Sequence, residues 1–375
     1  MKFNCPRSVL LNAITIASRT VSPKSTIPAL EGLLFETGMK GLTNLTVTGY
    51  NLKTGIRTKL EAEIQEEGRL VLNAKLFGDI IRKMPEGEVS VSTDKNLLVR
   101  LSCGVSYFEI MGTPADDFPE LPSVDAQTSF RIQEKKLQSM ISQTLFAVST
   151  NESRPVHTGS LFEIADSELT VVSVDGYRLA LRRELLDEET DISTSFVVPG
   201  AALNEAGKIA ADSEDLAVIS QGSKHIMFSI GDTEIISRRL EGEFLDYRKS
   251  VPSVHKYDLY ADRKELLNVF ERVSLMISEK YKSPVRCRFD DGLLKLSAAT
   301  AIGKATDECI VEGNAEGMEI GFNNRYILDA LHAAPGDRVN IQLISGVSPC
   351  VILPENADDR SYLYLILPVR IRAGE

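Results

Sequence analysis

The six-residue segment VLLNAI at positions 9–14 recurs twice in the chain, and this recurrence decides how the fold is divided. Its counterparts are KLQSMI at 136–141 and ELLNVF at 265–270. Taking Leu11, Leu137 and Leu267 as equivalent positions, the three copies are 126 and 130 residues apart. A period near one third of a 375-residue chain predicts three copies of one structural unit.

A second pattern repeats with the same period. An apolar, helix-like stretch, a polar turn and a strand-like stretch follow one another in residues 80–91, 206–219 and 327–341. Short runs rich in β-branched and aromatic residues, typical of strands, lie between the two patterns. The fold class that we expect is α+β, with three repeated domains. Each domain would pack two helices on antiparallel sheets of about eight strands.

Two extended segments predict the domain boundaries. Residues 114–122 are rich in proline and acidic residues, and residues 251–253 are Val-Pro-Ser. Proline disfavours helical backbone in the residue before it, so both segments indicate linkers. We therefore expect domains at 1–127, 128–254 and 255–375.

The composition is typical of a globular protein in a reducing compartment. Hydrophobic residues make up 43% and charged residues 25% of the chain, which argues against disorder. No apolar run reaches the roughly 18 residues of a membrane span, and polar residues interrupt any signal-peptide core. The five cysteines are scattered without a CxxC pair, so we expect buried thiols and a cytoplasmic location.

The usual signatures of catalysis do not occur in the sequence. The histidines (His157, His225, His255 and His332) share no metal-ligand spacing with one another or with a cysteine. The phosphate-loop, dinucleotide and nucleophile-elbow motifs are also missing. Carboxylate pairs such as Asp116 and Asp117 lie in turn-like contexts, where solvated turn residues are the simpler interpretation. We expect no catalysis, no cofactor and no metal.

The segment VDGYRLAL at 174–181 predicts a tight hairpin. Asp-Gly between two apolar runs suits a turn that needs a positive φ. A turn alone is the simplest interpretation. However, Tyr177, Arg178 and Leu179 would place a guanidinium and two apolar side chains beside it, where they could rim a small apolar pocket.

Several motifs, in their order, resemble the bacterial DNA sliding clamps, the beta subunits of DNA polymerase III. They are MKF at 1–3, PAL at 28–30, ADDFP at 115–119, DGYRLA at 175–180, FLDYR at 244–248 and LPVRI at 367–371. The resemblance covers essentially the whole chain. It implies a non-catalytic processivity factor of DNA replication, a head-to-tail homodimer closed into a ring of six domains around duplex DNA.

The resemblance also implies partners and site residues. The DNA polymerase III catalytic subunit, the clamp loader, other polymerases and repair proteins would insert short peptides between the second and third domains. The implied peptide pocket consists of His157, Val174, Gly176, Tyr177, Arg178, Leu179, Leu245, Lys249, Ser250, Val347, Pro349, Leu365, Leu367, Pro368, Val369 and Arg370. Four positions depart from the family pattern and leave the peptide preference open: Tyr177 replaces a histidine, Leu245 a proline, His157 a leucine and Ser250 an apolar residue.

Two further sets of residues follow from the same resemblance. The implied DNA contacts are Lys24, Lys75 and Asn151. In the implied dimer interface, Phe108 and Ile110 of one copy face Leu275 and Met276 of the other, although all four could be ordinary core residues. Residues 372–375 extend past the usual end of the family.

A ring would reconcile a DNA partner with the net charge of −11. Enclosure holds the DNA, so the electrostatic contacts need only be weak and the ring can slide. Acidic residues on the outside would discourage non-specific adhesion, while basic residues on inward helices would meet phosphates. The candidates are Arg19, Lys24, Arg82, Lys83, Lys135, Lys136, Lys208, Arg263 and Lys264.

On the residues alone, two other classes of protein stay open. A metabolic enzyme with duplicated domains would need a cluster of polar groups in a cleft, for which the sequence offers no candidate triad. A sequence-specific DNA-binding protein would need a basic recognition helix, which the sequence pI of about 5.1 disfavours.

Overall fold

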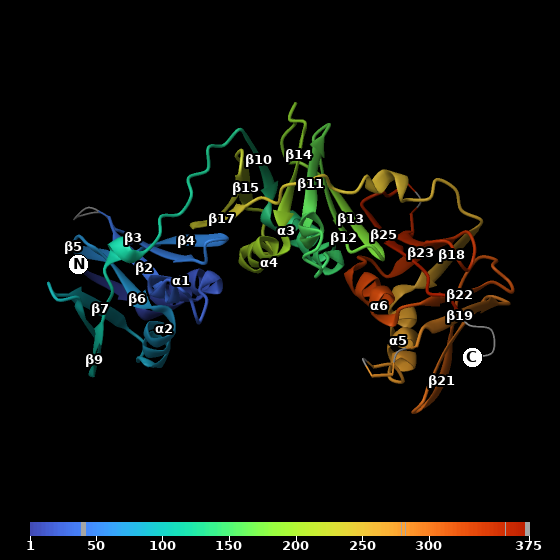
Figure 1. The fold of residues 1–375 in the computed structure, drawn as a ribbon, viewed down its shortest axis with the longest axis horizontal. Helices are drawn as coiled ribbons and strands as arrows, with labels where there is room; N and C mark the ends of the chain where they lie inside the picture. The colour runs from blue at the N-terminus through green and yellow to red at the C-terminus, as the bar shows by residue number, and fades with distance from the viewer. Residues whose placement is uncertain (39–42, 279, 282, 357, 372–375) are drawn as a thin grey trace. The chain divides into compact units, whose positions relative to one another are not determined.

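The computed structural model describes residues 1–38, 43–278, 280–281, 283–356 and 358–371, so the extension at 372–375 lies outside the described residues. The chain divides into two compact units. Figure 1 labels the helices and strands of both units in chain order. One comprises residues 1–138 and 201–239, and the other comprises residues 139–200 and 240–375. The division falls within the middle third of the chain, so each unit holds one complete repeat and one sheet of the middle repeat.

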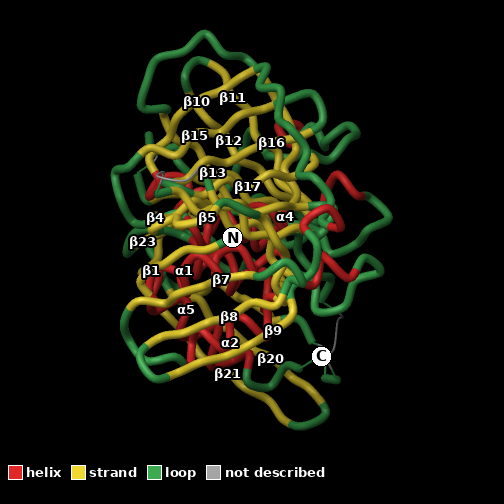
Figure 2. The backbone as a smooth tube through the Cα atoms, turned by 90° about the vertical axis from the view of Figure 1, so that its left-hand side faces the viewer, coloured by secondary structure: helices red, strands yellow, loops and turns green. Residues whose placement is uncertain are grey.

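The first unit contains a five-stranded sheet of order β5-β1-β7-β8-β9 and an eight-stranded sheet of order β10-β15-β16-β17-β4-β3-β2-β6. Figure 2 shows β1, β7, β8 and β9 running side by side. The elements are β1 (Lys2–Pro6), α1 (Arg7–Ala17), β2 (Gly32–Thr37), β3 (Asn44–Tyr50), β4 (Thr54–Glu61), β5 (Glu63–Glu66), β6 (Arg69–Asn73), α2 (Ala74–Lys83), β7 (Glu88–Thr93), β8 (Leu98–Cys103), β9 (Ser106–Met111), β10 (Thr128–Gln133), β15 (Leu216–Gln221), β16 (His225–Ile230) and β17 (Thr233–Arg238).

The second unit contains an eight-stranded sheet of order β14-β11-β12-β13-β25-β24-β23-β18 and a four-stranded sheet of order β21-β20-β19-β22. The elements are β11 (Gly159–Ala165), β12 (Glu168–Val174), β13 (Arg178–Leu185), β14 (Thr194–Pro199), β18 (Tyr257–Asp262), α5 (Arg263–Ser274), β19 (Val285–Asp290), β20 (Leu293–Thr300), β21 (Gly303–Ile310), β22 (Glu319–Phe322), α6 (Asn324–Ala333), β23 (Arg338–Leu343), β24 (Cys350–Pro354) and β25 (Tyr362–Ile366). The helices of the middle repeat are α3 (Glu134–Ser142) and α4 (Gly200–Ile209).

The helices form where the sequence supplies an apolar face and a cap. In α1, the buried side chains are Leu10, Ala13, Ile14 and Ala17, whose spacing places them on one face of an α-helix. Three other helices begin at a side chain that accepts a hydrogen bond from the first turn. These caps are Asn73 for α2, Asp262 for α5 and Asn323 for α6.

The threefold repeat predicted from the sequence is confirmed by the order of the elements. Each repeat runs strand, helix, strands, helix and three closing strands. The strands β4, β13 and β21 hold equivalent places in this order, and so do the last strands β9, β17 and β25. β17 pairs with β4 and β25 pairs with β13, so the last strand of one repeat adds to the sheet of another. β9 and β21 each pair on one side only among the described strands.

Candidate interaction sites

The predicted hairpin at Asp175 and Gly176 is confirmed. β12 ends at Val174 and β13 begins at Arg178, and Gly176 has φ +93°, a conformation that glycine adopts without strain. The carboxylate of Asp175 accepts hydrogen bonds from the backbone N–H groups of Tyr177 (2.9 Å) and Arg178 (3.1 Å). The aspartate therefore fixes the turn through its side chain as well as through its local backbone preference.

The Arg178 side chain turns inward, which differs from the expectation that its guanidinium would rim a pocket. The residue is only 7% exposed. Its Nε donates to Asp175 (2.9 Å) and its Nη1 to Asp329 of α6 (2.6 Å). Its Nη2 donates to the carbonyl oxygen of Phe146 (2.6 Å). A buried charge with two carboxylate partners and an oxygen acceptor is compensated, as its burial requires.

Aromatic rings continue from this arginine to the surface. The Cζ of Arg178 lies 4.6 Å from the ring centroid of Tyr326 on α6 and 5.3 Å from that of Phe146. The ring of Tyr177 stacks on Tyr326, with centroids 6.2 Å apart and planes inclined by 22°. Tyr177 is 62% exposed, so the stack ends in a solvent-facing ring.

An apolar cluster lies beneath the turn. It contains the buried side chains of Val174, Leu179 and Leu365, together with Tyr247 from the linker after β17. The hydroxyl of Tyr247 donates to Glu163 on β11 (2.8 Å), and Arg248 also donates to this carboxylate. Burial, and secondarily the Glu163 contact, raises the pKa of Tyr247 to about 12, so the phenol stays protonated and keeps donating. This bond fixes the linker to the sheet.

Five of the residues predicted for the peptide site form a set of exposed apolar side chains, called the apolar rim below. Tyr177, Leu245, Val347, Leu367 and Val369 are all exposed, although each is large and apolar. Leu367 N–H donates to the carbonyl oxygen of Tyr177 (2.9 Å), and Val369 N–H donates to that of Gly321 (2.8 Å). These two bonds hold the segment after β25 against the turn and against β22.

The remaining predicted residues differ in their contacts and in their exposure to solvent. Pro349 precedes Cys350, which pairs with Ile366, so Pro349 lies beside the end of β25. Lys249 pairs with Asp246 (2.9 Å), while Ser250 and Arg370 are exposed and Pro368 is half-buried. His157 packs edge-on against Phe244, with centroids 5.5 Å apart, and burial lowers its pKa. A hollow of about 520 Å³, lined by Tyr326, Val369 and Asn323 among others, opens beside this rim.

Sequence reasoning missed Tyr326, Asp329 and the role of Tyr247. Tyr326 and Asp329 are one helical turn apart on α6 and meet a turn about 150 residues earlier in the chain. No local pattern indicates that contact. Tyr247 does lie within the FLDYR motif at 244–248, which was the available signal.

The predicted DNA contacts do not lie on one element. Lys24 was expected on a helix, but it lies in an exposed loop. Lys75 is on α2, where it pairs with Asp79 (2.8 Å) and lowers the pKa of that carboxyl group. Asn151 lies in an exposed turn that its side-chain oxygen caps by accepting from Ser153 N–H (2.9 Å).

Several of the helical basic residues expected to meet phosphates already have acidic partners. Lys135 pairs with Glu214 (2.6 Å), Lys208 with Glu205 (3.1 Å) and Arg82 with Asp79 (2.7 Å). Exposed ion pairs of this kind contribute little stability and exchange readily with other partners.

The predicted interface residues lie on or beside β9 and β21, two of the strands that end a sheet. Phe108 and Ile110 are on β9, an edge of the five-stranded sheet, and Phe108 is 39% exposed. Leu275 and Met276 follow α5, which packs on β21, and Leu275 is 75% exposed. Val105, Tyr107 and Met111 around β9 are also exposed, as are Ile302 and Ile310 at the two ends of β21. Exposed apolar side chains along an unpaired edge favour association with another strand.

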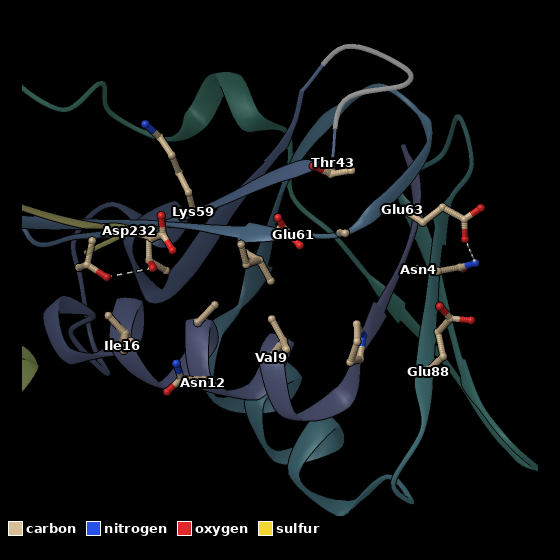
Figure 3. Close-up of a pocket in the computed structure, with 16 residues that line it drawn as sticks. Asn4, Val9, Asn12, Ile16, Thr43, Lys59, Glu61, Glu63, Glu88 and Asp232 are labelled. Carbon is tan, nitrogen blue, oxygen red and sulfur yellow. Dashed lines mark hydrogen bonds between the residues drawn. The ribbon is translucent and has the colours of Figure 1, made fainter. Parts of the chain in front are cut away.

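A separate hollow of about 730 Å³ lies between α1 and β4 in the first unit. Val9, Asn12 and Ile16 project from α1 toward it, while Glu63 at its far end accepts a hydrogen bond from Asn4 (3.0 Å; Figure 3). None of the residues predicted for peptide, DNA or dimer contacts lines this hollow.

Within the described ranges, no group of three or more His, Cys, Asp or Glu side chains is arranged to hold a metal ion. All five cysteines are free and buried. No helix in the part of the chain that the structure describes is long and apolar enough to cross a membrane.

Comparison with known proteins accounts for nearly the whole chain. Family models of the DNA polymerase III beta subunit match residues 1–122 (N-terminal domain), 131–246 (central domain) and 248–370 (C-terminal domain). The beta sliding clamp of Halalkalibacterium halodurans is 32% identical over 384 residues, with 99% of this chain and 100% of the relative covered. That of Staphylococcus epidermidis strain RP62A is 31% identical over 381 residues, with 99% of each chain covered.

Solved structures agree with this assignment. A putative DNA polymerase III beta subunit from Eubacterium rectale is 31% identical, with a TM-score of 0.92 over 98% of this chain and 99% of that chain. The sliding clamp of Bacillus subtilis is 28% identical, with a TM-score of 0.93 over 99% and 100% of the two chains. The clamp of Pseudomonas aeruginosa bound to griselimycin is 26% identical, with a TM-score of 0.92 over 99% and 100%.

The repeated α+β fold and these matches define a DNA sliding clamp, a processivity factor without catalytic activity. The chain belongs to the DNA polymerase III beta subunit family, as the resemblance of its motifs predicted.

Proposed function

We propose that two copies of this chain close head to tail into a ring around duplex DNA and tether a DNA polymerase to it. The strand pairing within the chain is the observation that carries this proposal. β4, β13 and β21 hold equivalent places in the three repeats. β4 pairs with β17 and β13 pairs with β25, each the last strand of another repeat, while β21 has no such partner among the described strands. Among the final strands of the repeats, β9 is the one that adds to no other repeat among the described strands. The repeat itself therefore predicts that β9 pairs with β21 of a second copy.

The chemistry of the two edges supports this pairing. Phe108 on β9 and Leu275 beside β21 would leave water on contact. Ile110 and Met276 are half-buried in the single chain, where Ile110 also packs against the core, and their exposed parts would extend the apolar seam. Each copy offers one β9 edge and one β21 edge, so two copies make two equivalent contacts. Head-to-tail contacts of this kind form a closed assembly when the rotation between copies is right.

DNA would be held by enclosure. Tight phosphate contacts would slow sliding, and a net charge of −11 together with acid-paired basic residues suits a weak electrostatic contact. We propose Lys24, Lys75 and Asn151 as contacts to the sugar-phosphate backbone. The proposal also includes domain boundaries near residues 127 and 254 and a cytoplasmic location.

The apolar rim around Tyr177, Leu245, Leu367 and Val369 is proposed as the site for partner peptides. A few exposed apolar side chains above a buried cluster suit small interfaces, in which a few anchors dominate the affinity. The griselimycin-bound clamp of Pseudomonas aeruginosa supports ligand binding by this fold. The partners would be the polymerase III catalytic subunit, the clamp loader, other polymerases and repair proteins.

Retention on DNA of different topology tests the ring. After loading onto nicked circular duplex, the protein should persist in moderate salt and be lost when the circle is cut, because weak contacts alone do not retain it. An end-blocked linear duplex serves as the control and should retain the protein. Equal retention on circular and freely ended DNA would contradict enclosure.

A further inference from the structure

We infer that Arg178 is a positioning residue of the candidate peptide site, holding Tyr177 and Tyr326 as a fixed aromatic wall without itself contacting the peptide. The inference rests on the proposed function of this site. It deepens that function by distinguishing Tyr177, which would contact the peptide, from Arg178, which would hold the Tyr177 ring in place.

The first step is that the guanidinium is already occupied. Nε, Nη1 and Nη2 each have an oxygen acceptor within 2.9 Å, and two of these acceptors are the carboxylates of Asp175 and Asp329. The Arg178 side chain is only 6% exposed. A peptide would have to displace short, charge-assisted bonds to reach it.

The second step is that Arg178 connects the stack of rings to the core. Tyr364, a buried core residue, contacts Phe146 at a centroid distance of 5.5 Å, and Phe146 lies 5.3 Å from the guanidinium. The guanidinium in turn lies 4.6 Å from Tyr326, on which Tyr177 stacks. Planar guanidinium groups stack on aromatic rings in a way that an ammonium group does not reproduce.

The third step concerns the exposed ring of Tyr177. An exposed side chain ordinarily exchanges among rotamers, and ordering it on binding opposes association. Here the backbone of Tyr177 is fixed by Asp175 and Leu367, and its ring is fixed by Tyr326. Loss of the arginine should therefore release the ring and weaken peptide binding by about tenfold, the scale of one immobilised side chain.

The alternative is that Arg178 bonds to the peptide directly. The two roles differ in what happens when Tyr177 is removed. A positioning residue acts through Tyr177, so its effect disappears in a Tyr177→Leu background, whereas a direct contact keeps its effect there. Asp329→Asn separates the roles further. This change loosens the guanidinium. If Arg178 positions the rings, peptide affinity should fall, whereas if Arg178 contacts the peptide directly, the freed guanidinium should still bind it.

The experiment measures the affinity of the full-length protein for a fluorescein-labelled Gln-Leu-Ser-Leu-Phe peptide. The variants are Arg178→Lys, Asp329→Asn, Tyr177→Leu and the double variants with Tyr177→Leu. Arg183→Lys is the matched control, because Arg183 lies on the same strand with half-buried contacts to Glu168 and Arg360. Thermal unfolding of each variant identifies changes that only reduce stability. Tyr326→Leu tests the same coupling in a second way, because it removes the ring that lies between Arg178 and Tyr177.

Near-ultraviolet circular dichroism gives a readout that does not depend on any peptide. The chain has no tryptophan, so this signal comes largely from its 10 tyrosines. We expect Arg178→Lys and Asp329→Asn each to reduce the tyrosine signal as Tyr177→Leu does. Each should also lower the peptide affinity about tenfold in the wild-type background, but not in the Tyr177→Leu background.

An undiminished effect of Arg178→Lys in the Tyr177→Leu background would overturn the inference. So would a tyrosine signal that Arg178→Lys and Asp329→Asn leave unchanged. If the wild-type protein does not bind the peptide at all, the proposed function of the site fails, and the tyrosine signal still decides whether Arg178 positions the rings.

Discussion

Replacing Leu275 with aspartate should convert the proposed dimer into monomers. Leu275 is 75% exposed in the single chain, beside the strand β21 that is expected to receive β9 of the second copy. Burying a whole leucine side chain contributes about 1.5–3 kcal/mol, so the exposed three quarters would contribute about 1–2 kcal/mol at each contact.

Aspartate removes this contribution and adds a buried carboxylate without a partner. The effective penalty for burying such a charge is several kcal/mol. The substitution occurs at both contacts of the ring, so the total loss should exceed about 6 kcal/mol. At 1.4 kcal/mol for each tenfold change, the dimer dissociation constant should rise by at least about 10⁴-fold.

Sedimentation velocity at micromolar protein provides the measurement, with circular dichroism to establish that the variant is folded. Val254→Asp is the matched control, because Val254 is 70% exposed but lies in the linker between the second and third repeats. This control should remain dimeric. A folded Leu275→Asp protein that still sediments as a dimer would refute the placement of the contact.

Other consequences of the structure can be measured in the same way. Ending the chain after Ile366 removes Leu367, Val369 and Arg370 and should abolish binding of the Gln-Leu-Ser-Leu-Phe peptide in a fluorescence titration. The dimer should survive, and retained peptide affinity would mean that the site has been misplaced. Gly49→Ala should lower the free energy of unfolding in urea by about 1–3 kcal/mol, because its Cβ would collide with the carbonyl oxygen of Ala17. Gly78→Ala, which meets only a methyl group of Ile14, should cost less. Burial raises the pKa of Cys5 to about 11 and that of Cys350 to about 12. Unfolded thiols ionise near pH 8.5, so the folded protein should lose stability as the pH rises from 8 to 10, and reaction of either thiol with a disulfide reagent at pH 8 before unfolding would contradict their burial.

The sequence predicted the features that depend on local chemistry or on repetition. The Asp175–Gly176 hairpin follows from a turn that needs positive φ, and the helix–turn–strand pattern at 80–91 became α2 and β7. Exposed apolar residues at Tyr177, Leu245 and Leu367 were chosen by resemblance, and the second unit brings Tyr177 and Leu367 together.

The features that the sequence did not reveal depend on contacts between distant segments. The inward turn of Arg178 requires Asp329, which lies 151 residues later. The division into two units cuts the middle third of the chain, because each of its two sheets is extended by strands of another repeat. Neither the pairing of β17 with β4 nor that of β25 with β13 leaves a local pattern, since strand order depends on tertiary structure.

The edge strands β9 and β21 have a consequence for how the proposed ring would open. Each contact joins a β9 edge to a β21 edge, and a closed pair has two such contacts. When one contact separates, the other still holds the two copies together, so the separated edges face each other at a high effective concentration. Closing again is then an intramolecular step whose rate does not depend on how much protein is present. DNA could enter or leave through a single separated contact while the protein remains a dimer throughout.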